Sequence, residues 1–229
     1  MSSSTYKKVT HCIFDMDGLL LDTERLYTMA YNRVANKYGK TFTWEIKGQT
    51  MGLQSHESAV AIVKALDLPM QPQELTEQLL PIYNEIFPQA SLLPGAERLL
   101  RHLKNNNIPI ALATSSTEKS YELKTQKSKD VFALFHHRVL GGSDPEVKKG
   151  KPSPDIFLVA AKRFPDNPDP STCLVFEDAP NGVQAAVNAG MQVVMVPDEN
   201  LPKNLTEKAT LVLKSLEQFE PEKFGLPAF

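Results

Sequence analysis

Two aspartates one residue apart are the side chains of this sequence that point most directly to chemistry. Asp15 and Asp17 stand at the end of an apolar run and are followed by Gly18. An EF-hand calcium loop is excluded, because glycine follows the second aspartate at once and no glutamate closes a twelve-residue loop. Aspartates after a strand can also form a turn or cap a helix, so the pair gains meaning only from the rest of the chain.

Three further polar groups follow apolar runs, and each has an ordinary structural alternative. The hydroxyl pair after residues 109–113 and the acidic pair after residues 172–176 could each cap a helix, and the lysine of a Gly-Lys-Pro loop could simply be solvated. That lysine is not a P-loop lysine, because proline follows it where serine or threonine is required. The residues are Thr114 with Ser115, Glu177 with Asp178, and Lys151.

These groups need elements that bring them together, and the chain alternates between strand and helix patterns. Short apolar runs predict strands, and apolar residues at intervals of three and four predict helices between them. We therefore predict an α/β fold with a doubly wound parallel sheet. The predicted strands are 9–14, 109–113, 138–140, 172–176, 192–196 and 210–213, and the predicted helices that alternate with them are 96–105, 117–127, 154–163 and 181–188.

Residues 21–92 show helical spacing and no convincing strand, which predicts an all-helical domain inserted into the core. The core then comprises residues 1–20 and 93–229. Within the insertion, helices are expected from about 22 to a stop at Gly39, over 55–66, and over 73–87. The carboxyl tail, with Pro221 and Pro227, is predicted to be irregular packing on the surface.

The carboxyl ends of parallel strands lie at one edge of a sheet, so the polar groups are expected to meet in one crevice. Carboxylates that converge there need a cation. Asp15 and Asp178, together with carbonyl and water oxygens, suit Mg²⁺, which takes only one or two carboxylates from protein. Thr114 and Ser115, beside backbone amides at a helix start, suit a phosphate group.

The composition limits the classes of molecule that the protein is expected to bind. Charged residues make up 23% of the 229 residues and the formal net charge is -2, which gives no electrostatic case for binding nucleic acid or an anionic membrane. No apolar run reaches about 18 residues, and the first residues lack the apolar stretch of a signal peptide. We expect a soluble, cytoplasmic, monomeric protein with a small-molecule partner. Cys12 and Cys173 fall in predicted strands, where buried free thiols are expected.

The four polar groups, in this order, resemble the motifs of the haloacid dehalogenase superfamily. The resemblance runs from Val9 to about Val196, and the helical insertion lies where that superfamily carries a helical cap. Longer segments, such as Phe14 to Glu24 and Leu174 to Val183, resemble the pseudouridine 5′-phosphatase group within it. The resemblance implies a Mg²⁺-dependent hydrolase of small phosphorylated metabolites that works through an aspartyl-phosphate.

The resemblance also implies roles for single residues. Asp15 is expected to attack phosphorus and to bind the metal, and Asp17 is expected to act as acid and base while its backbone carbonyl binds the metal. With Mg²⁺ beside Asp15, we expect Asp15 to stay ionised while Asp17 holds a proton. The remaining roles are Asp178 as metal ligand, Glu177 as a direct or water-mediated metal partner, Thr114, Ser115 and Lys151 as phosphate binders, and Glu24, Gly52 and Gln54 as readers of the substrate.

Several alternatives stay open. Leu53 stands where the family pattern has a basic residue, and the likeness also loosens over residues 117–130, so another substrate such as a sugar phosphate or flavin mononucleotide fits as well. A sugar phosphomutase has the same motifs. A dehalogenase lacks the second aspartate, so Asp17 argues against one, and retention of all four groups argues against a silent binding module.

Overall fold

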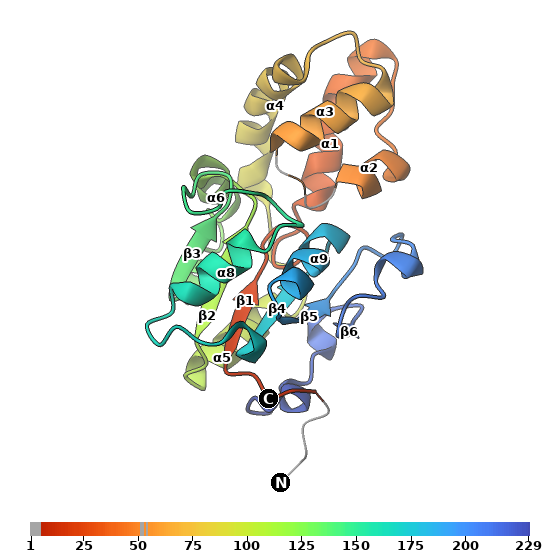
Figure 1. The fold of residues 1–229 in the computed structure, drawn as a ribbon. Coiled ribbons are helices and arrows are strands. Elements are labelled where there is room, and N and C mark those ends of the chain that lie inside the picture. The colour runs from red at the N-terminus through yellow and green to blue at the C-terminus, as the bar shows by residue number, and fades with distance from the viewer. Residues whose placement is uncertain (1–5, 51–52, 54) are drawn as a thin grey trace.

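The computed structural model describes residues 6–50, 53 and 55–229, and within them it contains a six-stranded parallel sheet (Figure 1). The strand order is β3-β2-β1-β4-β5-β6, so the chain runs outward from β1 in both directions. The strands are β1 His11–Phe14, β2 Ile110–Thr114, β3 His137–Leu140, β4 Cys173–Glu177, β5 Gln192–Met195 and β6 Leu211–Val212. This order is that of a doubly wound α/β fold and confirms the predicted fold class.

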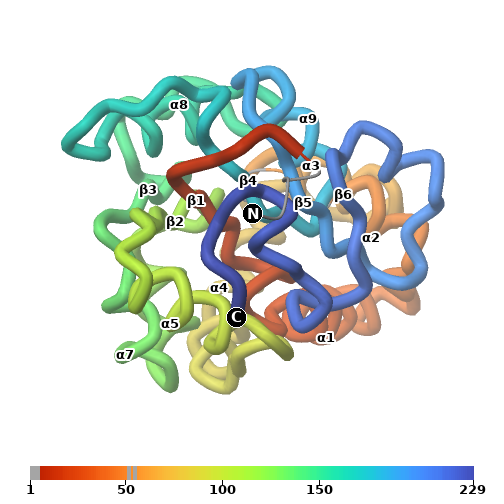
Figure 2. Tube along the Cα trace, turned by 90° about the horizontal axis from the view of Figure 1, so that it is seen from below, coloured from red at the N-terminus to blue at the C-terminus, as the bar shows by residue number. Residues whose placement is uncertain are grey.

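Helices cover both faces of the sheet because its strands are apolar on both sides. Cys12 and Phe14 of β1 point to one hydrophobic cluster, and Ile13 points to the other. Figure 2 shows α5 and α7 on one side of the sheet and α8 and α9 on the other. These helices and the short α6 are α5 Ala96–Asn105, α6 Glu118–Lys124, α7 Lys129–Phe132, α8 Asp155–Lys162 and α9 Pro180–Asn188.

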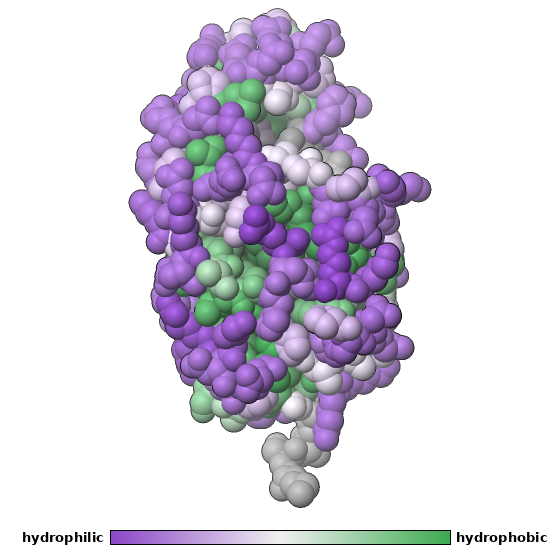
Figure 3. Space-filling view, turned by 90° about the vertical axis from the view of Figure 1, so that its left-hand side faces the viewer, coloured by the Kyte–Doolittle hydropathy of each residue, from purple (hydrophilic) through white to green (hydrophobic). Residues whose placement is uncertain are grey.

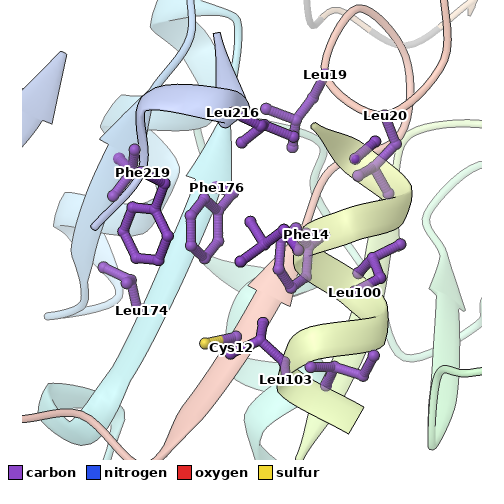
Figure 4. Close-up of a cluster of buried hydrophobic side chains, with 14 of the residues drawn as sticks. Cys12, Phe14, Leu19, Leu20, Leu100, Leu103, Leu174, Phe176, Leu216 and Phe219 are labelled. Atoms are coloured by element: carbon purple, nitrogen blue, oxygen red, sulfur yellow. The ribbon is translucent and has the colours of Figure 1, made fainter. Parts of the chain in front are cut away.

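The prediction that the carboxyl tail packs irregularly on the surface is wrong. The tail forms two short 3₁₀ helices, Leu216–Gln218 and Pro221–Phe224, and lies over one face of the sheet. Phe219 and Phe224 are only 2% and 0% exposed. Figure 4 shows Leu216 and Phe219 beside Phe176 of β4 in the cluster that also holds Phe14, and the Phe14 and Phe176 rings stack with centroids 4.4 Å apart.

The segment between β1 and α5 is helical and has a hydrophobic cluster of its own, at the top of Figure 1. The first helix is followed by a 3₁₀ turn that ends, as predicted, at Gly39, whose φ is 66°. Helix α2 was not predicted, nor was α7 in the core. The helices of this segment are α1 Glu24–Ala35, α2 Trp44–Thr50, α3 Ser55–Leu66 and α4 Pro72–Ile86, followed by a 3₁₀ turn Phe87–Gln89.

The chain crosses between this helical segment and the core at two adjacent points. The amide of Leu93 donates to the carbonyl of Leu20 over 2.8 Å, and the amide of Asp22 donates to the carbonyl of Ser91 over 2.9 Å. We propose the boundaries 20/21 and 92/93 for the cap because these bonds join the two crossings. Below, "cap" denotes residues 21–92 and "core" the rest of the chain.

Two further features of the molecule are its visible surface and its two thiols. The side of the molecule seen in Figure 3 is largely hydrophilic, with hydrophobic residues in separate patches. Among the described residues, no helix has the length and apolar character that crossing a membrane requires. Cys12 and Cys173 are buried free cysteines, as predicted.

Candidate active site

A pocket between the strand ends and the cap brings together those predicted site residues that the structure describes. Asp15 follows β1 directly, while Thr114 and Glu177 are the last residues of β2 and β4. These three polar residues therefore lie at the carboxyl edge of the sheet, which is where doubly wound folds bind ligands. The pocket is lined from the core by Asp15, Asp17, Thr114, Ser115, Ser116, Lys151, Glu177 and Asp178, and from the cap by residues that include Glu24, Tyr27, Tyr31, Lys47, Leu53, Tyr83 and Phe87.

A buried ammonium lies at the centre of the acidic residues. Lys151 Nζ donates to Asp15 Oδ1 and to Glu177 Oε1, each over 2.6 Å, and its side chain is 2% exposed. Burial alone would lower the pKa of Lys151, but the charges of Asp15 and Glu177 raise it above the ordinary value. Lys151 therefore stays charged, and it is not the solvated surface lysine that its loop also permitted.

Glu177 has its two oxygens engaged by the protein itself. Oε1 accepts from Lys151, and Oε2 accepts from the amides of Asp178 and Ala179 over 2.9 and 3.0 Å. Gly182, in the first turn of α9, leaves space for this carboxylate, because a Cβ at that position would overlap it. Glu177 thus holds Lys151 in place, and this geometry favours the water-mediated form of its predicted metal role.

Asp15 and Asp178 carry more negative charge than the protein neutralises. Burial and the charges of Glu177 and Asp17 outweigh Lys151 and raise the pKa of Asp15 to about 7. Burial, then Glu177 and Asp15, raise the pKa of Asp178 well above its ordinary value. Gly18, with φ at 77°, admits the Asp178 carboxylate to a place where a Cβ would collide with it.

Asp15, Glu177 and Asp178 form a cluster of acids that could hold a divalent cation, either directly or, for Glu177, through water. One carboxylate oxygen from each of Asp15, Glu177 and Asp178 lies within 4.8 Å of the others, and all three residues are buried. If all three carboxylates are ionised, they exceed the ammonium of Lys151 by two negative charges, which is the charge that Mg²⁺ would compensate. Oxygen donors of this kind are those that Mg²⁺ prefers, so the residues fit the expected ion.

Asp17 has a different environment, because four donors surround its carboxylate. Oδ1 accepts from Lys124 Nζ over 2.5 Å and from the Thr23 hydroxyl over 2.7 Å. Oδ2 accepts from the hydroxyls of Ser116 and Thr114 over 2.9 and 3.2 Å. Burial favours the neutral acid, but the charge and hydrogen bond of Lys124, helped by Thr23 and Ser116, lower the pKa of Asp17 below its ordinary value.

Without a metal ion, the pKa of Asp15 is therefore higher than that of Asp17, which is the reverse of the expected order. The pKa of Asp15 is raised and that of Asp17 is lowered. A cation beside Asp15 would lower its pKa, and a change in the contact between Asp17 and Lys124 would raise that of Asp17. The expected protonation states thus depend on the ion and on the surroundings of Asp17, rather than on the pair by itself.

The two hydroxyls predicted to bind phosphate are placed differently. Thr114 is fully buried, and its hydroxyl donates to Asp17 while it accepts from the amide of Ser116 over 3.1 Å. Ser115 is half-buried and lines the pocket. Of the two, Ser115 has the side chain that is open to a ligand, and Thr114 shapes the turn and holds Asp17.

The cap side of the pocket is aromatic, with one acid and one lysine at its rim. The rings of Tyr27, Tyr83 and Phe87 pack together, with Tyr27 and Phe87 centroids 5.2 Å apart. Glu24 Oε2 lies 3.5 Å from Lys47 Nζ, which also lies 3.6 Å from Asp198 of the core. Of the predicted substrate readers, Glu24 lines the pocket, whereas Gly52 and Gln54 lie outside the described residues.

Sequence reasoning did not identify Lys124, Ser116, Thr23, Tyr27 or Lys47 as site residues. The sequence does not distinguish the buried Lys124 from the exposed Lys119 of the same helix. Each lysine has a polar neighbour, and the helix is short. Ser116 carried a usable signal, because it is the third hydroxyl of a run at a strand end. Thr23 and Tyr27 lie one turn apart at the start of α1. Nothing in the sequence shows that this helix contacts the site, because the contact arises from the three-dimensional fold.

Comparison with known proteins places these motifs in a family. The model of the haloacid dehalogenase-like hydrolases matches residues 9–190. A protein of Drosophila melanogaster named "Probable pseudouridine-5'-phosphatase" is 56% identical over 229 residues, which are 100% of this chain and 99% of that protein. The "(DL)-glycerol-3-phosphatase 1, mitochondrial" of Arabidopsis thaliana is 48% identical over 224 residues, which are 96% of this chain and 75% of that protein.

The fold has relatives among solved structures. The crystal structure of β-phosphoglucomutase from Clostridium difficile superposes with a TM-score of 0.79 and is 27% identical. The match covers 94% of this chain and 97% of that one, so it includes both the sheet and the helical segment. The chain is therefore similar in sequence to two phosphatases and in structure to a mutase.

Proposed function

We propose a reaction for this chain on the premise that it belongs to the haloacid dehalogenase-like hydrolase family, as the match over residues 9–190 and the 56% identity over its whole length show. The proposed reaction is the hydrolysis of a small phosphomonoester through an aspartyl-phosphate on Asp15. We propose pseudouridine 5′-phosphate as the substrate, which agrees with the name of the 56% identical relative.

One observation carries the proposed chemistry. The buried Asp15 carboxylate follows β1 directly and lines the pocket, held by Lys151 at 2.6 Å and accompanied by two further buried acids. A nucleophile that is fixed in place, next to a cation that can also bind phosphoryl oxygens, is what in-line displacement at phosphorus requires. The surplus negative charge gives the divalent ion a place beside it.

The proposed first step transfers the phosphoryl group to the protein. An Asp15 oxygen bonds to phosphorus as the bond from phosphorus to the leaving oxygen breaks, and Asp17 gives that oxygen a proton. Lys151 and the Ser115 hydroxyl bind phosphoryl oxygens, which neutralises and orients the group. In the second step Asp17 takes a proton from water, the water oxygen bonds to phosphorus, and the bond to Asp15 breaks to release phosphate.

Mg²⁺ is the proposed cofactor, and its proposed ligands are Asp15, Asp178 and the backbone carbonyl of Asp17. When bound, it would offset the negative charge of the phosphoryl group and of the acids. Glu177 supports this arrangement through Lys151 and the amides of Asp178 and Ala179.

The cap supports a substrate with a flat, partly polar leaving group. Tyr27, Tyr83 and Phe87 offer aromatic surface, and the hydroxyls of Thr28 and Thr50 line the same pocket. Aromatic rings of this kind pack against a nucleobase, and hydroxyl groups can bind a ribose. We propose Glu24, Gly52 and Gln54 as readers of the leaving group, with the cap excluding water as it closes.

A second candidate is a phosphatase for glycerol 3-phosphate, which agrees with the name of the 48% identical relative. Sugar phosphates and flavin mononucleotide also remain candidate substrates, and the structural likeness to a β-phosphoglucomutase keeps a phosphomutase among the alternatives. We further propose that the enzyme acts in the cytoplasm as a monomer, a setting in which the buried free thiols of Cys12 and Cys173 are ordinary.

The test is phosphate release with Mg²⁺ and with EDTA, measured as kcat/KM on five esters. These are pseudouridine 5′-phosphate, uridine 5′-phosphate, glycerol 3-phosphate, flavin mononucleotide and β-glucose 1-phosphate, with the Asp15→Asn variant as the blank. The proposal expects turnover that needs Mg²⁺, is absent in the variant, and is highest on pseudouridine 5′-phosphate. A preference for glycerol 3-phosphate would replace the substrate, and no metal-dependent release from any ester would refute the phosphatase.

A further inference from the structure

Lys124 is a buried cation that the reaction above does not use. Its side chain is 0% exposed, and it reaches the pocket edge from the last turn of α6. Its Nζ has three hydrogen-bond partners, which match the three protons of an ammonium. They are Asp17 Oδ1 at 2.5 Å, Tyr27 Oη at 2.7 Å and Ser116 Oγ at 2.8 Å.

The two carboxylate oxygens of Asp17 have different hydrogen-bond partners. Oδ1 is held by the ammonium of Lys124 and by the Thr23 hydroxyl. Among the described residues, Thr114 and Ser116 donate to Oδ2, both through hydroxyl groups, and a hydroxyl can turn from donor to acceptor. The ammonium therefore anchors the carboxyl group through Oδ1. Oδ2 is the oxygen whose hydroxyl neighbours could accept a hydrogen bond from it when it carries the proton that the proposed reaction requires.

The same ammonium also contacts the cap. Tyr27 lies in α1, and the Nζ of Lys124 is 4.7 Å from the centre of its ring and 4.8 Å from that of Phe87. Contacts of a cation with aromatic faces at such distances are attractive, the more so when water is excluded. A single core lysine thus links the proton-transfer residue to two aromatic residues that line the leaving-group side of the pocket.

We propose that Lys124 is a positioning residue for the phosphatase reaction: it fixes Asp17 through Oδ1 so that Oδ2 meets the leaving oxygen, and it ties that position to the cap through Tyr27. This inference rests on the proposed function. The competing explanation is that Lys124 only fills and neutralises a buried gap between α6 and α1, in which case its loss would weaken folding without acting on one chemical step.

The test compares two esters that differ in their need for a proton. Pseudouridine 5′-phosphate releases an alkoxide, which must be protonated, whereas p-nitrophenyl phosphate releases a stable phenolate. kcat/KM, which reports the steps up to the first phosphoryl transfer, is measured on both for wild type, Lys124→Met, Lys124→Gln and Asp17→Asn. Lys119→Met, an exposed lysine of the same helix, is the matched control.

The Asp17→Asn variant sets the largest difference expected between the losses of kcat/KM on the two esters. For Lys124→Met and Lys124→Gln we expect a loss of about 100-fold on the alkyl ester and less than about tenfold on the aryl ester, within the range of general acid catalysis. Lys124→Arg, which keeps a cation, should recover part of the alkyl ester rate, and Lys119→Met should match wild type on both. If pseudouridine 5′-phosphate is not turned over, uridine 5′-phosphate or glycerol 3-phosphate serves as the alkyl ester.

Two results would overturn the inference. One is an equal loss on both esters with a lowered melting temperature, which a purely structural lysine would give. The other is unchanged rates in either neutral variant. Failure of the proposed function is distinguishable, because then the wild type itself would release no phosphate from either ester. If Lys124→Met does not fold, the neutral and polar Lys124→Gln decides.

Discussion

Replacing Asp15 with asparagine is expected to stabilise the metal-free protein at neutral pH. In the structure the Asp15 carboxylate is buried beside Glu177 and Asp178, and Lys151 opposes their repulsion through ion pairs with Asp15 and Glu177. Asparagine has nearly the same shape, and its carbonyl oxygen can still accept the hydrogen bond from Lys151. The change therefore removes one buried negative charge and leaves the packing intact.

The size of the effect follows from the pKa of Asp15. Its ordinary value of 3.8 is raised to about 7 in the folded protein, a change of about three pH units. One unit corresponds to about 1.4 kcal/mol, so the ionised carboxylate costs at most about 4 kcal/mol of stability. Because Asp178 shares part of this repulsion, we expect a gain of about 2 to 4 kcal/mol for Asp15→Asn at pH 8.

The sign of the pH dependence is fixed by which state binds the proton. Between about pH 4 and pH 7 the folded wild type keeps the Asp15 proton that the unfolded chain releases. Wild-type stability therefore falls as pH rises through this range and is level above it. The asparagine variant does not titrate there, so its advantage should widen by about 2 kcal/mol between pH 5 and pH 7.

The assay is urea unfolding in EDTA across pH 5 to 8, repeated with Mg²⁺. Mg²⁺ should stabilise the wild type more than Asp15→Asn and so reduce the gap. Glu207→Gln, which removes a charge from an exposed position, serves as the control and should show no gap that widens with pH. A variant that is less stable than wild type at pH 8, or a gap that does not change with pH, would refute the electrostatic reasoning.

Three further substitutions test other parts of the account. Gly182→Ala should displace the Glu177 carboxylate and lower kcat by about 100-fold, because the new Cβ would overlap it; an unchanged kcat would show that the carboxylate can move without harm. Lys47→Met should raise KM by about tenfold with little change in kcat, because Lys47 lines the pocket and its ion pairs with Glu24 and Asp198 join the cap to the core there. A tenfold change corresponds to about 1.4 kcal/mol of binding free energy. An unchanged KM would contradict this. Phe219→Ala should cost about 3 to 5 kcal/mol of unfolding free energy and the 45% exposed Phe229→Ala less than about 1, which urea unfolding can measure.

The motif residues could be predicted because their positions follow from topology. Asp15 follows β1 directly, and Thr114 and Glu177 are the last residues of β2 and β4. Parallel strands bring their carboxyl ends to one edge of the sheet, whatever the sequence between them. The same alternation of apolar runs predicted the sheet. Because these inferences depend on period and order alone, they needed no knowledge of side-chain contacts.

The residues that the sequence did not reveal act through contacts between distant elements. Lys124 meets Asp17 across 107 positions and Tyr27 across 97, and nothing near it in sequence marks it as buried. The tail was misjudged for a related reason: its prolines indicated irregular backbone on the surface, whereas the tail forms two short 3₁₀ helices and its Phe219 and Phe224 side chains are buried. Phe219 packs against Phe176 with ring centroids 4.9 Å apart, so the tail belongs to the core.

The most direct test of the central claim is to trap the covalent intermediate. Enzyme mixed with Mg²⁺ and the fastest ester is quenched in acid within milliseconds, reduced with borohydride, digested and analysed by mass spectrometry. Borohydride converts an aspartyl-phosphate to homoserine, and the account predicts that change at Asp15 in the wild type and its absence in Asp15→Asn. Turnover with no modification at Asp15 at any quench time, or modification at Asp17, would contradict the account.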